Sequence, residues 1–145
     1  GHRVRRVYFG ERKVPRSGDE RLYIPADGTS RSSLSNGWET LRIGNSSTQN
    51  STLGVTVEEC VFYRAIHAHD GGTEDTVGDS EIISNKSRGN IFRRNTFLNS
   101  HGQLTLRHGD YAVVEGNVFL AGGAHDAEGR VVLAEPANRA MGGVR

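Results

Sequence analysis

The stretch Val57-Glu58-Glu59-Cys60-Val61-Phe62 is one of four copies of a six-residue pattern that organises this chain. Most copies have an apolar residue, two polar residues, a small or amide residue, a variable residue and then phenylalanine. The other copies occupy residues 4–9, 92–97 and 114–119. Four copies are hard to obtain by chance, and self-similarity of this kind is the signature of a repeat architecture.

Successive copies begin 53, 35 and 22 residues apart. A 22-residue step suits one turn of a β-solenoid, so the longer steps are expected to carry insertions, or two turns in the case of 53. Equivalent residues such as Asn95 and Asn117 would stack about 4.8 Å apart on successive turns and bond through their amides. Phe62, Phe97 and Phe119 are predicted to form one buried column.

Further strand-like runs lie between the copies, at residues 39–43, 81–84 and 104–108, and another strand is expected to open at 142–144. No stretch keeps the apolar spacing of a helix, while segments 27–37 and 122–130 have the composition of loops. The sequence predicts an all-β chain, residues 1–145 being a fragment of a right-handed, single-stranded parallel β-helix. A β-sandwich is the alternative, but it calls for hairpins, whereas these copies repeat in one direction.

The composition argues against several classes of protein. Lys and Arg number 18 against 17 Asp and Glu, which is not the basic excess of a nucleic-acid binder. No apolar run approaches the roughly 20 residues of a membrane span, and no signal peptide is visible. Cys60 has no partner for an internal disulfide. We therefore expect no nucleic-acid or membrane partner, and the oligomeric state stays open.

One region departs from this even balance of charge. It is an N-terminal basic cluster made of Arg3, Arg5, Arg6, Arg12, Lys13 and Arg16. A solvated surface is the first interpretation, and a patch that attracts a polyanion is the alternative.

Two cations are spaced by almost one turn of the repeat. Lys86 and Arg107 stand 21 residues apart, so they are expected to project from adjacent turns on the same side. Each positive charge disfavours the other, so Lys86 would be partly neutral and usable as a general base. Two ordinary surface cations in one column are the alternative.

Carboxylates lie just upstream of this pair. Asp79 and Glu81 are two residues apart and would share one face of a strand. Counting back from the copies puts Asn45 one turn from Glu81, with Asn50 as the fallback. Two carboxylates and an amide oxygen are hard ligands suited to Ca²⁺, so the sequence predicts a calcium site, with a solvated acidic turn as the alternative.

Other candidates carry weaker signals. His108, beside Arg107, is a candidate donor to a bound anion or a structural residue, and Arg145 is a further candidate substrate contact. Trp38 suits packing better than a sugar platform. The tightest histidine cluster lacks a cysteine partner, so zinc is not expected; it consists of His67, His69 and Asp70.

Residues 80–87, Ser-Glu-Ile-Ile-Ser-Asn-Lys-Ser, followed by Gly89-Asn90 and residues 94–97, resemble polysaccharide lyase family 6, which contains alginate lyases and chondroitinase B. Residues 104–109 and 39–44 resemble two further signatures, and the clear resemblance spans 39–123. It implies a β-helix with Lys86 as Brønsted base, Arg107 as acid and Glu81 as a calcium ligand, with Asp79 where the family often has Glu. It also implies secretion or a periplasmic location.

We therefore expect a lyase that cuts uronate-containing acidic polysaccharide by β-elimination, with Ca²⁺ as cofactor. Alginate is the first expected substrate because alginate lyases dominate the family. No residue selects it over dermatan sulfate, and none sets endo or exo action. A non-catalytic polysaccharide-binding solenoid is the alternative of another class, although such a module has no need of a base one turn from an acid.

Overall fold

The structure, a computed structural model, describes residues 1–10, 39–65, 81–100, 102–120, 124–125, 131–132 and 143–144. Within these ranges the regular elements are short strands, and no helix that could cross a membrane is found there. The strands are β1 (Arg3–Arg5), β2 (Tyr8–Gly10), β3 (Leu41–Ile43), β4 (Thr56–Glu58), β5 (Val61–Tyr63), β6 (Glu81–Asn85), β7 (Ile91–Arg93), β8 (Thr96–Leu98), β9 (Gln103–Thr105), β10 (Val113–Glu115), β11 (Val118–Leu120), β12 (Ala124–His125) and β13 (Val131–Val132).

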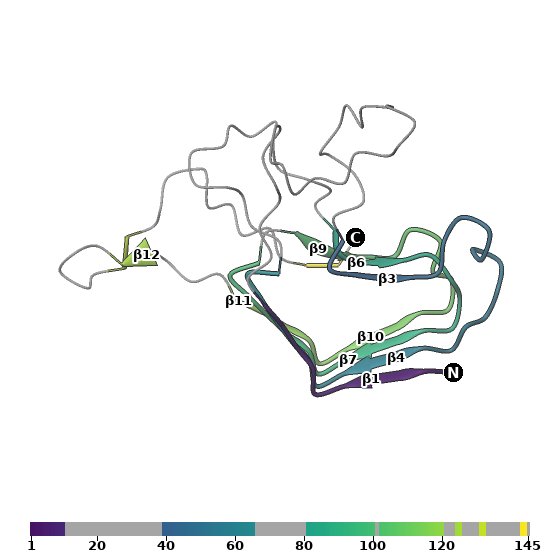
Figure 1. Cartoon of the computed structure of the whole chain (residues 1–145), viewed down its shortest axis with the longest axis horizontal. Helices are drawn as coiled ribbons and strands as arrows, with labels where there is room; N and C mark the ends of the chain where they lie inside the picture. The colour runs from purple at the N-terminus through teal and green to yellow at the C-terminus, as the bar shows by residue number, and fades with distance from the viewer. Residues whose placement is uncertain are drawn as a thin grey trace, which may run out of the picture.

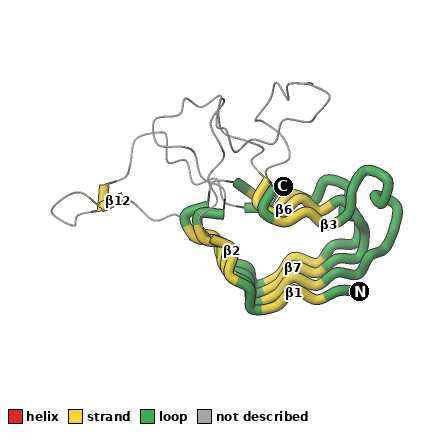
Figure 2. Tube along the Cα trace, in the orientation of Figure 1, coloured by secondary structure: helices red, strands yellow, loops and turns green. Residues whose placement is uncertain are grey.

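Eleven of these strands form three parallel sheets around one interior (Figure 1). Sheet 1 contains β1, β4, β7 and β10, sheet 2 contains β2, β5, β8 and β11, and sheet 3 contains β3, β6 and β9. Each turn of the chain passes through sheet 3, sheet 1 and sheet 2 in that order, as the stacked tubes of Figure 2 show. The fold is the predicted parallel β-helix, and the parallel pairing of every strand in these sheets excludes a β-sandwich.

The strand register confirms the repeat read from the sequence. Val4 pairs with Val57, Val57 with Phe92, and Phe92 with Val114, so the four copies are equivalent positions on four successive turns. The 53-residue step is therefore one turn with an insertion between β2 and β3, and the alternative of two turns is wrong.

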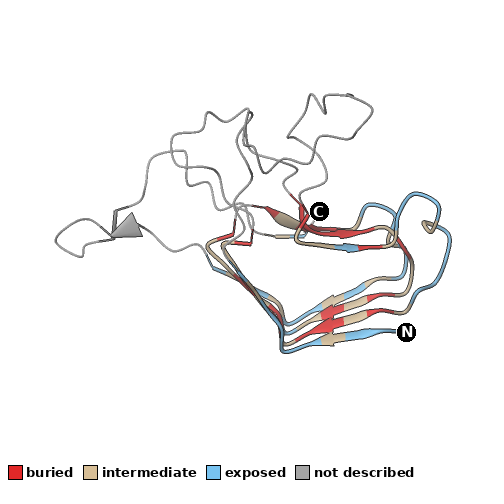
Figure 3. Ribbon diagram, viewed as in Figure 1, coloured by how far each residue is buried: buried red, intermediate tan, exposed pale blue. Residues whose placement is uncertain are grey.

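A column of phenylalanines fills the interior beneath sheet 2. Ring centroids are 4.7 Å apart for Phe9 and Phe62, 4.8 Å for Phe62 and Phe97, and 4.4 Å for Phe97 and Phe119, all stacked nearly parallel. These distances follow from the spacing of hydrogen-bonded strands. Figure 3 shows that burial is greatest in the middle turns, while β1 and β10 are more exposed. The predicted column is confirmed, with Phe62 and Phe97 buried and Phe119, on the last described turn, partly buried.

Buried amides satisfy the backbone at the corners between sheets. Asn95 accepts a hydrogen bond from the Cys60 N–H at 3.0 Å and donates to Asn117 Oδ1 at 3.0 Å, so the predicted asparagine stack is confirmed. Asn90 accepts from the Val55 N–H at 2.8 Å in the same way. A buried N–H without a partner costs free energy, so these side chains allow the chain to turn inside the core.

One residue in the left-handed region turns the chain from sheet 1 into sheet 2. Its φ is 56° at Arg6, 54° at Glu59, 52° at Arg94 and 60° at Gly116. The N–H of this residue donates to the neighbouring turn, as from Glu59 to the Arg93 carbonyl at 3.2 Å. Non-glycine residues pay a steric cost in this region, and this hydrogen bond offsets part of it.

Two boundaries differ from those expected. The run 104–108 is a strand only as far as Thr105, after which the chain turns. Segment 122–130, expected to be a loop, contributes β12, which pairs antiparallel with β13. The strand expected at 142–144 is observed as a parallel bridge between Val144 and Leu104. Segment 27–37 lies outside the described residues.

Candidate active site on sheet 3

Lys86 and Arg107 lie on adjacent turns, as their spacing predicted. In the β6–β9 pair, Ile83 is opposite Leu104 and Ser84 is opposite Thr105, an offset of 21 residues. Lys86 and Arg107 each follow two residues later, where both strands end. Both cations therefore lie at the same end of the sheet 3 strands, just past their C-terminal residues.

The backbone around Lys86 is held by the turn that follows β3. The Lys86 N–H donates to the Ile43 carbonyl at 2.8 Å. Gly44, with φ of +78°, packs so closely that a β-carbon there would be 3.0 Å from the Lys86 carbonyl oxygen. Glycine is needed here both for its conformation and for the close approach. On the other side, the Asn85 carbonyl accepts from the His108 N–H at 3.3 Å.

Each cation has a carboxylate neighbour. Arg107 Nε is 3.0 Å from Glu81 Oε1, and Lys86 Nζ is 3.9 Å from Glu39 Oε1. The Glu39 and Glu81 side chains are 4% and 6% exposed, Lys86 is 12% exposed and Arg107 is 46% exposed. These carboxylates offset the electrostatic repulsion that the sequence led us to expect between Lys86 and Arg107.

Glu39 is the residue that sequence reasoning missed. Glu39 stands two residues before β3, the strand that pairs with β6, and its carboxylate lies 3.9 Å from Lys86 Nζ. Arg42, in β3, also approaches Glu39, at 3.9 Å. The signal was present, because Glu39 begins a run already singled out as strand-like.

The placement of Asn45 beside Glu81 is wrong. Ile43 is opposite Asn85, the last residue of β6, so Asn45 follows the left-handed turn at Gly44 and lies past the end of the strand that Glu81 begins. Its Oδ1 accepts from the N–H and hydroxyl of Ser47, at 2.8 and 2.5 Å, and stabilises an exposed turn. The fallback, Asn50, is in the same exposed turn region.

The described carboxylates fit a hard cation in part. Glu81 Oε2 is buried and has no hydrogen-bond partner among the described residues, and Glu39 is on the neighbouring turn. A buried carboxylate oxygen without a donor is costly unless a cation or another ligand meets it. No group of three His, Cys, Asp or Glu side chains suited to a metal occurs within the described ranges, and Asp79 lies outside them.

Ser84 lies in β6, the middle strand of sheet 3. It stands in the outward row Arg42–Ser84–Thr105 across the three strands, yet it is fully buried. Within the described part of the chain its Oγ has no hydrogen-bond partner.

Among the remaining predicted site residues, the structure describes His108. His108 is exposed, and its backbone bonds to Asn85. The others lie outside the described residues: Trp38, His67, His69, Asp70, Asp79 and Arg145.

The described part of the N-terminal basic cluster is paired rather than free. Glu59 lies within 3.2 Å of Arg5 and 2.8 Å of Arg6, and Arg94 is 3.2 Å away on the other side. Hydrogen bonds from Arg5 and then Arg6 lower the pKa of Glu59 to about 2. Arg3 lies 3.4 Å from Glu58 on the same face of sheet 1. This pairing favours a structural role over attraction of a polyanion.

The described turns thus form a parallel β-helix that carries a lysine, an arginine and two buried carboxylates on neighbouring turns. Residues 2–137 match the family model described as Chondroitinase B. The chain is also similar to a solved structure of a PL6 family alginate lyase, AlyGC, in a mutant form, with 39% sequence identity and a TM-score of 0.59. This chain belongs to polysaccharide lyase family 6.

That similarity covers 82% of this chain and 12% of AlyGC. The chain therefore spans only a small part of the length of the relative it matches. Among curated proteins, none matches the chain.

Proposed function

We propose that the protein containing this chain is a lyase that cleaves uronate-containing polysaccharide by β-elimination. The observation that carries the proposal is the placement of Lys86 and Arg107 on adjacent turns, beside the buried carboxylates Glu39 and Glu81. Family membership supports the same chemistry. A module that only binds polysaccharide would have no use for a base and an acid at this separation.

In the proposed reaction, Lys86 removes the proton at C5 of the uronate unit. The electron pair of that C–H bond forms a C4–C5 double bond as the C4–O4 bond breaks. Arg107 donates the hydrogen bond that stabilises the negative charge on the departing O4, which then takes up a proton from solvent water. A general base contributes about 10²–10⁴ in rate to such a proton transfer.

Ca²⁺ is the proposed cofactor. Glu81 and Glu39 would hold it, because Glu81 has a buried Oε2 that lacks a hydrogen bond within the described ranges. Asp79, two residues before Glu81 in the sequence, is the further proposed ligand, and Asn45 has no place in the set. When bound, the ion would neutralise the substrate carboxylate and so make the C5 proton more acidic.

Exhaustive chelation is expected to abolish turnover, and added Ca²⁺ is expected to restore it. Full activity after chelation would contradict the proposed role of the ion.

Alginate is the first proposed substrate, since the similar solved structure is described as an alginate lyase. Dermatan sulfate is the second, since the matching family model is described as Chondroitinase B. A polymeric substrate of either kind is degraded outside the cytoplasm, so we propose a secreted or periplasmic protein.

The test is an assay of the full-length protein with alginate, polymannuronate, polyguluronate and dermatan sulfate. The ultraviolet absorbance of the unsaturated uronate reports each cleavage. Product from the first three supports alginate, and product from dermatan sulfate alone supports the second candidate. Absence of unsaturated product from all four would overturn the proposed function.

A further inference from the structure

The corner between sheet 3 and sheet 1 contains a buried amide on the turn that carries Lys86. This residue is Asn90, which stands immediately before β7 and is fully buried. Because β4, β7 and β10 start in register, the residues immediately before β4 and β10 hold the equivalent position on the neighbouring turns. Those residues are Val55 and Ala112. The corner can therefore be built with an apolar side chain at this position.

One atom of the Asn90 side chain has a structural role that recurs elsewhere in the fold. Its Oδ1 accepts from the Val55 N–H at 2.8 Å, just as Asn95 Oδ1 accepts from the Cys60 N–H at 3.0 Å at the corner between sheets 1 and 2. An oxygen acceptor is all that a buried N–H requires. The two corners differ in what the amide nitrogen of the asparagine does.

The amide nitrogen of Asn90 holds the residues on both sides of Lys86. Asn90 Nδ2 is 2.7 Å from Asn85 Oδ1, 3.0 Å from the Ser87 carbonyl oxygen and 2.8 Å from Ser87 Oγ. The nitrogen of Asn95, in contrast, donates to residues of neighbouring turns. Asn85 and Ser87 are both fully buried. The chain is thus fixed immediately before and immediately after Lys86.

This polar network stands where the preceding turn has apolar packing. Asn85 is paired with Ile43, which belongs to the hydrophobic core. Asn85 Nδ2 is buried and has no hydrogen-bond partner within the described ranges, so the network fills the interior at a cost in free energy that an apolar side chain avoids. Such a departure from the most stable packing is expected beside a functional site, where the geometry of a reacting group matters more than stability.

We propose that Asn90 is a positioning residue for Lys86 and acts through its hydrogen bonds to Asn85 and Ser87. The inference rests on the proposed function, in which Lys86 removes the C5 proton. The Lys86 N–H is bonded to the Ile43 carbonyl at 2.8 Å, and the Asn90 network fixes the backbone on either side of that bond. A fixed backbone keeps the amine at the substrate, and a misplacement of about 1 Å can lower a rate about 10²-fold.

The experiment compares Asn90→Val with Asn95→Val in full-length protein. Each variant leaves one buried N–H without its acceptor, that of Val55 or that of Cys60, so both should lower the Tm. Asn90→Val also releases the backbone around Lys86. Its kcat should fall about 10–10²-fold with KM nearly unchanged. Asn95→Val is the matched control and should keep the wild-type kcat when both proteins are assayed well below their Tm.

A milder pair of variants keeps the test decisive if Asn90→Val does not fold. Ser87→Ala removes one hydrogen-bond partner of Asn90 and leaves the bond to the Val55 N–H in place, so kcat should fall severalfold with KM unchanged. Ser100→Ala is its control. Ser100 is also buried, and its hydroxyl accepts from the Ala65 N–H at 3.0 Å, two residues past the end of β8 in sheet 2. This variant should keep the wild-type kcat.

Equal kcat values for Asn90→Val and Asn95→Val, or a wild-type kcat in Ser87→Ala, would overturn the inference. A change confined to KM would overturn it as well, because a displaced base slows the chemical step and leaves binding of the polysaccharide intact. Failure of the proposed function looks different. In that case the wild-type protein releases no unsaturated uronate from any of the four polysaccharides, and the role assigned to Asn90 is refuted with it.

Discussion

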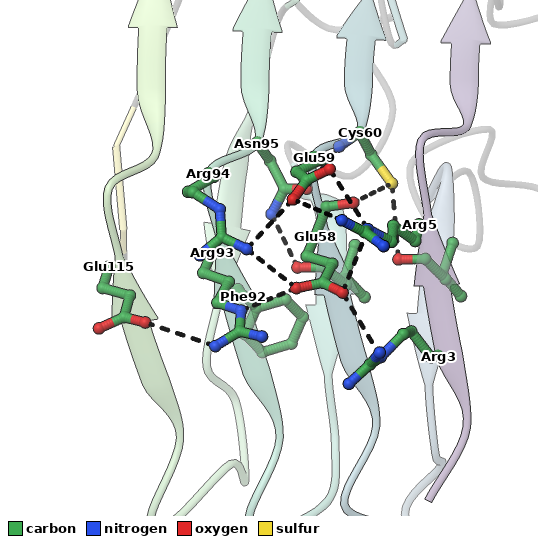
Figure 4. A network of polar contacts seen from close by, with 12 residues as sticks. Arg3, Arg5, Glu58, Glu59, Cys60, Phe92, Arg93, Arg94, Asn95 and Glu115 are labelled. Atoms are coloured by element: carbon green, nitrogen blue, oxygen red, sulfur yellow. Dashed lines mark hydrogen bonds and ion pairs between the residues drawn. The ribbon is translucent and has the colours of Figure 1, made fainter.

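Sheet 1 and sheet 3 both carry acidic and basic side chains on their outer faces, but the charges are arranged differently. On sheet 1, Glu58 is surrounded by Arg3, Arg5, Arg93 and Arg94 at 2.8–3.6 Å, as Figure 4 shows. On sheet 3, the described structure places Arg107 beside Glu81 at 3.0 Å, and the buried Oε2 of Glu81 has no hydrogen-bond partner there.

The difference follows from the register. Arg5, Glu58, Arg93 and Glu115 occupy one column of sheet 1, so opposite charges alternate on successive turns. Alternation of this kind neutralises the column and opposes a slip of one turn against the next. On sheet 3, by contrast, the residue paired with Glu81 in β9 is the neutral Gln103. We infer that sheet 1 uses its charges to hold the turns together and sheet 3 keeps them for a ligand.

The largest expected effect is on turnover, from Lys86→Ala. Removal of a general base is expected to lower the rate by about 10²–10⁴, while the fold survives because the side chain lies outside the core. Release of unsaturated uronate and thermal unfolding are measured in parallel. Arg3→Ala on sheet 1 is the control and should keep its turnover, because Arg3 is 62% exposed and distant in the register. A Lys86→Ala protein with near wild-type turnover would refute the mechanism.

Arg107 tests whether shape matters as well as charge. Arg107→Ala should reduce turnover to background. Arg107→Lys should recover only part of it, roughly tenfold or more below wild type, because an ammonium lacks the planar fork that grips two oxygens at once. The measurement is kcat and kcat/KM on the polysaccharide that the wild-type protein cleaves. Complete rescue by lysine would show that a point charge is enough.

Calcium should affect stability as well as turnover. If Glu81 helps to hold the ion, Ca²⁺ at about 100 times its Kd stabilises the folded protein by about 2.7 kcal/mol. The measurement is Tm with and without added Ca²⁺ after chelation. Glu81→Gln keeps the shape but weakens the oxygen donors, so its Tm should respond much less. An equal Tm shift in both proteins would place the ion elsewhere.

The smallest expected effect is the acid sensitivity of sheet 1. Arginine partners lower the pKa of Glu59 from 4.5 to about 2, and a hydrogen bond from Arg93 lowers that of Glu58. A lowered folded-state pKa gives stability that is complete above pH 4.5 and lost as the pH falls toward 2. Tm measured across this range should therefore decline less steeply in Glu59→Gln than in wild type.

Glu115→Gln is the matched control for this measurement. Its side chain is 58% exposed, and its contact with Arg93 is 4.0 Å. The slope of Tm against pH should match wild type in this variant. If Glu59→Gln also keeps the wild-type slope, the sheet 1 column does not contribute acid-sensitive stability.

The amino-acid sequence by itself determined the repeat and the relative positions of residues within or next to paired strands. The phenylalanine column and the Asn95–Asn117 bond follow from one six-residue pattern, because strands paired in register place equal positions at equal heights. The 21-residue offset between Lys86 and Arg107 could be predicted for the same reason, since both residues closely follow strands that pair with each other.

Only the tertiary structure decided where Asn45 and Glu39 lie relative to the strands of sheet 3. The sequence argument counted back from β4 to Asn45 across the turn at residues 44–54, and that corner differs in length from one turn of the helix to the next. Counting across a connection of variable length loses the register. Backbone hydrogen bonds between β3 and β6 fix it, so that Asn45 follows the end of the paired strands, and Glu39, just before β3, reaches Lys86 at 3.9 Å. The arginine pairing on sheet 1 likewise depends on which side chains the turns bring together, which no single turn specifies.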